Sequence, residues 1–323
     1  METIILYLLM ASLVVFLSIK LAIYVDLIEK KTDLSGFLVG GIILACVTSL
    51  PEFFTSLASV FFLKKSELVL GNILGSDLFN CTILLIMLFL SFKNFKNCFV
   101  TNSQRKVIFC ILGVYGLAAT IMISADIFPT IYNINLMSFA IFVLYALTTL
   151  IIASDTEEDF NPPLVKEEKE HYAKMPVSTI WIRFGICSIA LIAASIAITY
   201  LSNELAIQFN LSASLAGALF LGVATSLPEL VSTIELIRLK NINSAISGIT
   251  GSNIFNFTIV ALADVLNGNQ AIYNFNADAK ELVIFGIGVH FVLLGLLYFK
   301  FIMFLNKKPR YSTKLNRDKK KEA

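Results

Sequence analysis

The sequence predicts an all-α protein: a polytopic bundle of membrane-spanning helices built from two inverted-topology repeats. Three observations favour this fold class. The 323 residues are 57% hydrophobic and only 15% charged, whereas soluble domains are about a quarter charged. Residues 155–174 and 307–322 hold ten charges each, which leaves long apolar segments elsewhere. Two short sequence blocks also occur twice, once in each half of the chain.

Nine segments are long and apolar enough to cross a membrane as helices. A span needs about 20 residues, because a helix rises about 1.5 Å per residue through a hydrocarbon layer of about 30 Å. The first segment follows Glu2 with no basic residue before it, so we interpret it as a span and not as a cleaved signal peptide. The nine predicted spans are residues 4–23, 36–63, 68–92, 107–125, 134–153, 179–201, 212–237, 245–266 and 282–305.

The distribution of Lys and Arg predicts how the spans are oriented, since cytoplasmic loops retain positive charge. With the amino terminus outside, the cytoplasmic side collects 20 Lys and Arg, and the outer side has three: Lys64, Lys65 and Lys280. We therefore expect an integral protein of the inner or plasma membrane, in contact with the lipid bilayer, with its carboxyl terminus in the cytoplasm. The net charge of +2 does not suggest a nucleic-acid partner.

A polar segment divides the chain nearly in half. We assign residues 1–153 to a first repeat of five spans and residues 179–306 to a second repeat of four. Residues 154–178 form a cytoplasmic linker, interpreted from its composition as a connector and less readily as a regulatory segment. Residues 307–323 form a basic cytoplasmic tail.

The two halves share two sequence blocks. Residues 40–53 read GGIILACVTSLPEF and residues 217–230 read GALFLGVATSLPEL; residues 71–80 read GNILGSDLFN and residues 247–256 read SGITGSNIFN. Because five spans precede the linker, the two TSLPE segments are expected to run in opposite directions. This is the arrangement of secondary transporters in which two interrupted helices meet near the membrane midplane.

Each TSLPE segment contains a proline inside a predicted span. Pro51 cannot donate a backbone hydrogen bond, so it frees the carbonyl of Val47, and Pro228 creates the same break in the second repeat. A single kink of this kind is often structural, because nearby hydroxyls satisfy the released carbonyls. The glutamate after each proline makes a functional reading the stronger one.

Glu52 and Glu229 are carboxylates at bilayer depth. Such a group costs several kcal/mol unless it is paired, protonated or bound to a cation. No Lys, Arg or His follows Glu52 before Lys64, and Arg238 lies more than two helical turns beyond Glu229. The pair therefore predicts a cation site, and the alternative is two protonated glutamates in a polar bundle core.

The oxygen atoms around these glutamates indicate which ions would bind. Carboxylates, freed carbonyls and hydroxyls form a hard oxygen shell that suits Ca²⁺ and also serves Na⁺, and the two negative charges make their occupancy mutually exclusive. Residues four apart share a helical face, so the Ser and Asn pairs of the second block either complete the shell or pack between helices. The predicted ligands are Glu52, Glu229, Thr48, Thr225, Ser49, Ser226, Ser76, Asn80, Ser252 and Asn256. For Gly71, Gly75 and Gly251 we expect close helix approach instead of binding.

These paired blocks resemble the two alpha repeats of the sodium/calcium exchanger family within the calcium/cation antiporter superfamily. The signature covers residues 36–80 and 213–256. The resemblance implies a bacterial-type exchanger in which Glu52 and Glu229 bind Ca²⁺ or Na⁺ and the hydroxyl and amide side chains named above are further ligands. It also implies that the first and sixth spans slide against the site-bearing bundle to alternate access.

The chain departs from the family pattern at three places. Asn256 stands where many relatives have an Asp associated with potassium dependence. The resemblance therefore argues against K⁺ co-transport by this chain. Asp77 replaces a small or amide residue, and either faces another helix or adds negative charge near the site. The family usually has ten spans with the carboxyl terminus outside, whereas a counterpart of the fifth span is missing from the second half.

The sequence thus predicts an antiporter that expels Ca²⁺ against inward Na⁺. Proton-coupled cation exchange is the alternative within this class, because a buried glutamate can carry a proton as well as a metal. A non-cycling cation channel, or a degenerate membrane protein, is the alternative from another class. No Walker motif, nucleophile elbow or HExxH occurs, so we expect neither an enzyme nor a cofactor beyond the transported ions. The sequence does not predict an oligomeric state.

Overall fold

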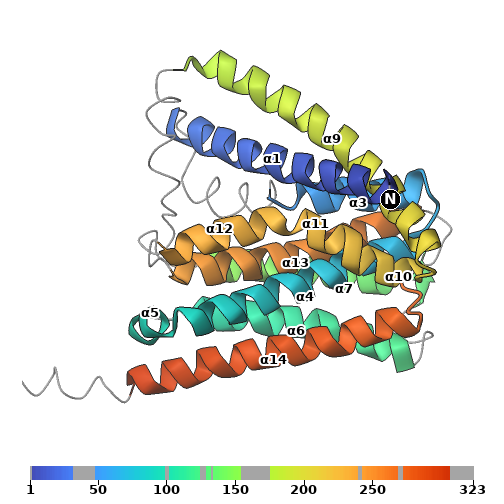
Figure 1. The fold of residues 1–323 in the computed structure, drawn as a ribbon. Coiled ribbons are helices and arrows are strands. Elements are labelled where there is room, and N and C mark those ends of the chain that lie inside the picture. The colour runs from blue at the N-terminus through green and yellow to red at the C-terminus, as the bar shows by residue number, and fades with distance from the viewer. Residues whose placement is uncertain are drawn as a thin grey trace, which may run out of the picture.

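The structure is a computed structural model that describes residues 2–31, 48–98, 102–123, 129–131, 134–153, 175–238, 242–267 and 272–305. Almost all of these residues are helical (Figure 1). The first half contains α1 (Glu2–Lys31), α3 (Leu50–Phe61), α4 (Ser66–Leu90), α5 (Phe92–Asn97), α6 (Asn102–Ile123), strands β1 (Thr130–Ile131) and β2 (Ile134–Asn135), and α7 (Leu136–Ala153). The second contains α9 (Val177–Gln208), α10 (Ala213–Ala216), the π-helix η4 (Gly217–Gly222), α11 (Val223–Thr225), α12 (Leu227–Arg238), α13 (Ile242–Asn267) and α14 (Ala277–Leu305).

Long apolar helices confirm the predicted membrane bundle. Among the described residues, six of them can cross a membrane by length and composition, namely α1, α4, α6, α9, α13 and α14, and the bent pair Ala213–Thr225 and Leu227–Arg238 is a seventh when its two parts are counted as one span. In the described part of the chain, α3 and α7 are apolar but shorter, and they coincide with the second and fifth predicted spans. Residues 36–47 of the second span lie outside the described ranges, as do most of the linker and the basic tail. The total of nine spans stays a prediction.

A Schellman-type turn terminates the longest helix, α9. The backbone of Asn210 adopts the left-handed conformation, with φ 54°, which asparagine tolerates better than most residues. The N–H of Leu211 donates to the carbonyl oxygen of Ala206 at 2.8 Å and so satisfies one carbonyl of the last turn. α9 ends there, and α10 begins at Ala213 with Ser212 as its N-cap.

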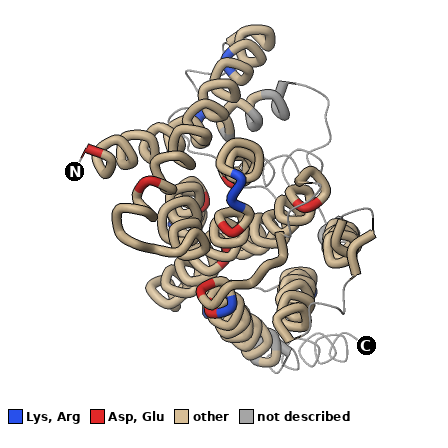
Figure 2. Tube along the Cα trace, turned by 90° about the vertical axis from the view of Figure 1, so that its right-hand side faces the viewer, with Lys and Arg blue, Asp and Glu red and all other residues tan. Residues whose placement is uncertain are grey.

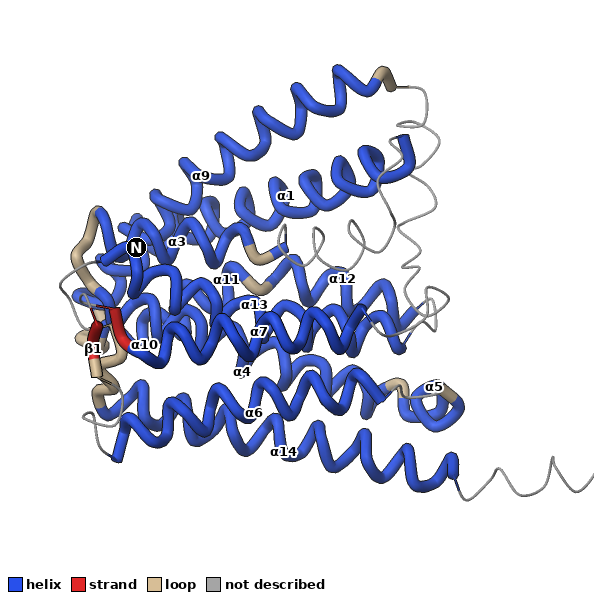
Figure 3. Tube along the Cα trace, turned by 180° about the vertical axis from the view of Figure 1, so that it is seen from behind, coloured by secondary structure: helices blue, strands red, loops and turns tan. Residues whose placement is uncertain are grey.

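The helices form three groups across the bundle. α1 and α9 run antiparallel along one side, α6 and α14 lie on the opposite side, and α4, α12 and α13 lie between them (Figure 1). The view from behind shows the same order (Figure 3). Buried Val14 of α1, Leu191 of α9 and Leu221 of η4 belong to one apolar cluster. The α1–α9 pair is therefore attached to the central helices by side-chain packing.

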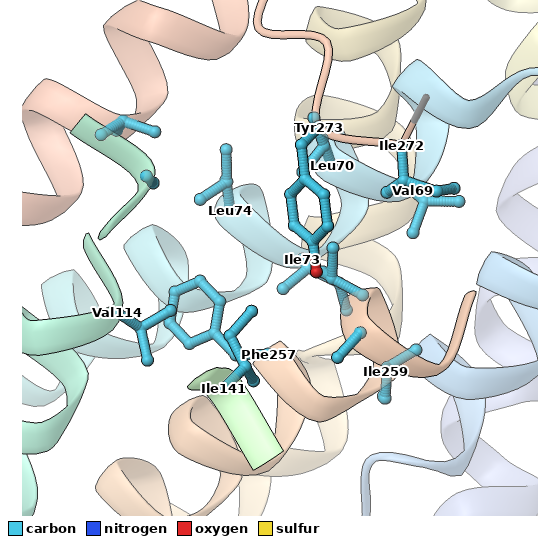
Figure 4. Close-up of a cluster of buried hydrophobic side chains, with 14 of the residues drawn as sticks. Val69, Leu70, Ile73, Leu74, Val114, Ile141, Phe257, Ile259, Ile272 and Tyr273 are labelled. Atoms are coloured by element: carbon cyan, nitrogen blue, oxygen red, sulfur yellow. The ribbon is translucent and has the colours of Figure 1, made fainter. Parts of the chain in front are cut away.

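The largest apolar cluster joins the central helices to α6 and α7. Ile73 of α4, Val114 of α6, Ile141 of α7 and Phe257 of α13 meet there with Tyr273, which follows α13 (Figure 4). Burying these side chains fixes α4 and α13, which are the helices that follow the two TSLPE segments.

Each TSLPE segment has a turn at its serine, as the two prolines predict. The turn residues are Ser49 and Ser226, and α3 and α12 begin at the next residue. Each proline then lies in the first helical turn, where a missing N–H costs no intrahelical bond. In the second repeat the two helical parts are bent by 46° at the break.

The two repeats are inverted, as expected. α3 and α12 leave the centre of the bundle toward opposite ends, and α4 and α13 also run in opposite directions (Figure 1; Figure 3). The breaks of the two repeats therefore lie near each other in the middle of the bundle.

Glycines allow α4 to pack unusually close to the helix of the second repeat. A Cβ atom on Gly71 would collide with the carbonyl oxygen of Ser214, and one on Gly75 with the backbone of Ala218. A Cβ on Gly222 would lie 2.8 Å from the backbone nitrogen of Ser76. The prediction of close approach is confirmed for Gly71 and Gly75. For Gly251 no described atom of another element lies within 4 Å of the added carbon, and residues 36–47 lie outside the described ranges, so close approach there stays a prediction.

A small hairpin, absent from the sequence prediction, precedes α7. Thr130 pairs with Asn135 and Ile131 with Ile134. Asp264 of α13 holds it in place, since its Oδ2 atom accepts hydrogen bonds from the backbone N–H of Asn135 at 2.8 Å and from Ser138 Oγ at 2.7 Å. This buried carboxylate therefore links α13 to the hairpin and to the start of α7.

Few charged positions occur along the described helices. Viewed along the bundle, Lys, Arg, Asp and Glu are isolated positions on a mostly uncharged trace (Figure 2). Glu52 and Asp77 are fully buried, and Glu229 is 3% exposed. These three carboxylates therefore need a chemical explanation.

Candidate cation-binding site

The breaks in the two repeats place Glu52 and Glu229 in equivalent positions. Each glutamate lies in the first turn of a helix, Glu52 in α3 and Glu229 in α12. The unpaired N–H groups of a first turn carry partial positive charge, which favours a carboxylate. The helix ends therefore stabilise negative charge at both glutamates.

Hydroxyl groups from both repeats surround the Glu52 carboxylate. Ser226 Oγ, from the second break, donates to Glu52 Oε1 at 3.3 Å. The side chains of Thr225 and Ser76 lie close enough to interact with the same carboxylate. Glu52 thus meets two hydroxyls of the opposite TSLPE segment and one from the following helix of its own repeat.

The Glu229 carboxylate has the matching surroundings. Ser252 Oγ of α13 donates to Glu229 Oε1 at 3.1 Å, and Thr48 of the first break lies close enough to interact with the carboxylate. Ser49 Oγ lies 2.8 Å from Ser252 Oγ, and because the single Ser252 proton goes to Glu229, Ser49 is the donor. The inverted repeats thus build two similar half-sites.

Each carboxylate keeps one oxygen for a ligand. Glu52 Oε2 and Glu229 Oε2 are buried and have no hydrogen-bond partner among the described residues. The two glutamates are also close enough to repel each other electrostatically. A buried pair of this kind is stabilised when a cation lies between the two charges.

The remaining ligands would be neutral oxygens. Among the residues that the structure describes, no group of three or more His, Cys, Asp or Glu side chains could hold a metal ion. A site of two carboxylates with several hydroxyls fits this finding, and it is made of the hard ligands that Ca²⁺ and Na⁺ accept.

The predicted ligands fall into two layers. Eight of them gather around the glutamate pair: Thr48, Ser49, Glu52, Ser76, Thr225, Ser226, Glu229 and Ser252. Asn80 and Asn256 lie in a neighbouring polar layer. Asn80 Nδ2 donates to Asn253 Oδ1 at 3.1 Å, and Asn256 faces Asp77. The ligand roles of these two asparagines stay predictions.

Ser76 has a second contact that positions it. Its hydroxyl lies 3.2 Å from the carbonyl oxygen of Gly222, to which it donates. The close packing of α4 on η4 makes this bond possible, because Gly222 has no side chain to hold the helices apart. The close contact at Gly222 therefore helps to position the Ser76 hydroxyl in the candidate site.

Asn72 is a site-forming residue that sequence reasoning missed. Its Nδ2 atom lies 3.3 Å from the Glu52 carbonyl oxygen, 3.0 Å from Thr55 Oγ1 and 3.1 Å from Ser56 Oγ. It therefore holds the first turn of α3, which carries Glu52. The second repeat has Gly248 at this position, so the repeat comparison gave no signal for Asn72.

One protein family matches most of the chain. The family described as sodium/calcium exchanger protein matches residues 3–153 and 179–317. The inner membrane protein YrbG of Escherichia coli (strain K12) is 26% identical over 253 residues, which cover 77% of this chain and 74% of YrbG.

Solved structures of other exchangers share the fold. The H⁺/Ca²⁺ exchanger CAX has a TM-score of 0.72 and 15% identity, over 94% of this chain and 81% of CAX. The sodium-calcium exchanger NCX_Mj has a TM-score of 0.52 and 18% identity, over 95% of this chain and 98% of NCX_Mj. The helical membrane bundle described above is therefore an exchanger fold.

Proposed function

Because the chain belongs to the sodium/calcium exchanger family and is an integral membrane cation antiporter, we propose that it expels Ca²⁺ in exchange for inward Na⁺. One observation carries the proposal. Two buried glutamates of inverted broken helices each keep an oxygen without a partner, in a shell of hydroxyls from both repeats. The shell supplies oxygen ligands for a bare cation, and among side chains in the described part of the chain only hydroxyl groups donate to the two carboxylates.

The charge of the site supports an exchange of one ion for another. Two carboxylates balance one Ca²⁺, and the same two charges balance Na⁺ ions that replace it. Occupancy by one ion then excludes the other, because both need Glu52 and Glu229. Thr48, Ser49, Thr225 and Ser226 supply neutral oxygens to whichever ion is present.

Movement of α1 and α9 against the central helices would expose the site to the two sides in turn. Both helices lie on one side of the bundle, next to the broken spans (Figure 1). Tyr7 Oη of α1 donates to the carbonyl oxygen of Phe220 at 2.7 Å, and Asn203 of α9 accepts from Lys65 Nζ at 2.6 Å. These few polar contacts would break and re-form during the cycle.

The proposed location is the inner membrane of a bacterium, with the amino terminus outside and the carboxyl terminus in the cytoplasm. The Lys and Arg asymmetry supports this orientation. Ca²⁺ would then bind from the cytoplasm and leave outside while Na⁺ moves inward.

Flux in reconstituted vesicles tests the proposal. Vesicles loaded with Na⁺ and diluted into Na⁺-free buffer should take up labelled Ca²⁺, and Glu52→Gln or Glu229→Gln should reduce uptake to that of empty vesicles. The matched control is Glu204→Gln, which changes an exposed glutamate of α9 and should leave uptake unchanged. Absence of Na⁺-driven uptake by the wild-type protein would refute Na⁺ coupling.

The same vesicles separate the alternatives. A pH gradient that drives Ca²⁺ uptake when the Na⁺ gradient does not would identify proton coupling. Uptake that needs no counter-ion gradient would identify a channel. Loss of uptake in both glutamine variants under a pH gradient would still assign the site to Glu52 and Glu229.

A further inference from the structure

A third buried carboxylate, Asp77 of α4, has no role in the glutamate site described above. It is fully buried, and neither of its side-chain oxygens has a hydrogen-bond partner among the described residues. It follows Ser76 directly, and a step of one residue turns the side chain by about 100° around the helix. Asp77 therefore faces away from the direction in which Ser76 approaches Glu52.

Further unpaired oxygen-bearing groups surround this carboxylate. The Asn256 amide and the Tyr115 hydroxyl lie next to the Asp77 carboxylate but outside hydrogen-bond geometry, and both are buried and unpartnered within the described chain. Asn80 lies one turn beyond Asp77, and its Oδ1 atom is likewise buried without a partner. Helices α4, α6 and α13 thus bring polar side-chain atoms close to the Asp77 carboxylate, and these atoms form no hydrogen bonds with one another.

The backbone and side chains around this place are firmly held. Asn253 Nδ2 donates to the backbone carbonyl of Asp77 at 3.2 Å, and Asn253 Oδ1 accepts from Asn80 Nδ2 at 3.1 Å. The ring of Tyr115 packs edge-on against Phe257 at 5.2 Å between centroids. A Cβ atom on Gly286 of α14 would collide with the Tyr115 hydroxyl, so this glycine makes room for it.

The nearby histidine does not supply a positive charge to Asp77. His290 Nδ1 lies 2.8 Å from the carbonyl oxygen of Gly286, and Nδ1 must be the donor in this bond. Nε2 lies 3.4 Å from Asn253 Nδ2, which can only donate. Nε2 is therefore the acceptor, and the ring is the neutral tautomer. The charge of Asp77 stays uncompensated by protein groups in the described chain.

An uncompensated carboxylate among unpaired oxygens is a site for a cation. We propose that Asp77 is the anionic ligand of a second cation subsite, which binds one Na⁺ with the side-chain oxygens of Asn80, Asn256 and Tyr115. One negative charge with neutral oxygens matches a monovalent ion. Asp77, Glu52 and Glu229 do not converge on a single metal position, so the subsite is separate from the glutamate pair.

This proposal rests on the proposed Na⁺ exchange and specifies one of the ions that drive it. Asp77 and Glu52 are close enough to interact electrostatically. Na⁺ at Asp77 would therefore reduce repulsion between the carboxylates and favour the Na⁺-loaded form of the glutamate pair. Ca²⁺ binding in the absence of Na⁺ would not need the subsite.

Equilibrium binding to the purified full-length protein tests the subsite independently of transport. Labelled Na⁺ should bind to Asp77→Asn with one ion fewer per chain than to the wild type. Half-displacement of bound Ca²⁺ should need about ten times more Na⁺, because an ion–carboxylate contact in a low-dielectric interior is lost. Ca²⁺ affinity without Na⁺ should stay unchanged. The matched control is Asp264→Asn, which alters a buried carboxylate of the α13–α7 connection and should not change the Na⁺ count.

The outcomes separate this proposal from the exchange function. An unchanged Na⁺ count in Asp77→Asn, with normal Ca²⁺ binding, overturns the subsite and leaves Na⁺ exchange standing. A reduced Na⁺ count in a protein that shows no Na⁺-driven uptake supports the subsite and refutes only the exchange. If Asp77→Asn does not fold, the Tyr115→Phe variant tests the subsite instead. It removes one ligand oxygen and should weaken Na⁺ binding severalfold. Unchanged Na⁺ affinity in that variant overturns the proposal.

Discussion

At the scale of single residues, the site combines residues that occur in both repeats with residues that occur in only one of them. The duplicated TSLPE segments made Glu52, Glu229 and their hydroxyl neighbours predictable, because each appears twice with the same spacing. Asn72 and Asp77 have no counterpart of the same kind in the second repeat. The sequence marked Asp77 as a departure from the family pattern, whereas the importance of Asn72 became visible only through its contacts with α3.

Replacing Asn72 should impair transport more than folding. Asn72→Ala removes the amide that holds the Glu52 carbonyl and two α3 hydroxyls, so the carboxylate loses its fixed position. We expect the Ca²⁺ concentration for half-maximal uptake to rise about tenfold, the equivalent of one lost hydrogen bond to a positioned group. Asn94→Ala on α5, at the end of the bundle, is the control. Equal Ca²⁺ dependence in Asn72→Ala and wild type would contradict this role.

At the scale of helices, proline and glycine positions predicted much of the structure. Pro51 and Pro228 located the breaks, and Gly71 and Gly75 located the close packing of α4. The same prediction for Gly251 stays open, since residues 36–47 of the first repeat lie outside the described ranges. The π-helix η4 and the β1–β2 hairpin carried no recognised sequence signal, because tertiary contacts and not local propensity determine them.

The glycine contacts of α4 should make a measurable difference in stability. In Gly71→Ala the new methyl group meets the backbone of Ser214, which cannot move aside like a flexible side chain. We expect a loss of roughly 1–3 kcal/mol in the free energy of unfolding, seen as a lower melting temperature in detergent. Gly248→Ala is the matched control: no described atom of another element lies within 4 Å there, and alanine favours helix by about 1 kcal/mol. A Gly71→Ala protein as stable as Gly248→Ala would show that the contact is not as close as described.

At the scale of the whole molecule, hydropathy predicted the membrane bundle, and the duplicated blocks with five spans before the linker predicted the inverted repeats. The number of spans could not be fixed in the same way, because α3 and α7 are too short to meet a length criterion and part of the second span lies outside the described residues. The orientation depends on charges in loops and at the carboxyl terminus, which the helix packing does not test.

A reporter fused after Ala323 should be active only in the cytoplasm. The reason is the basic tail, which carries eight Lys and Arg between Lys307 and Lys321 and would be retained inside. A second reporter inserted in the linker after Pro163 should give the same result, and a tag placed before Met1 should be accessible from outside. If the fusion after Ala323 and the tag before Met1 both report from outside, the chain has an even number of spans.

The glycine contacts between α4 and η4 also bear on the direction of transport. A carrier with two identical inverted repeats would have inward-open and outward-open forms that are related by a two-fold rotation and equal in energy. Here α4 packs through Gly71 against the backbone of Ser214, whereas the counterpart of Gly71 in α13 is Ser247, whose Cβ atom prevents an equally close contact. If the protein alternates as proposed, its two forms bury different surfaces, and the packing itself biases the resting equilibrium between them before any ion gradient acts.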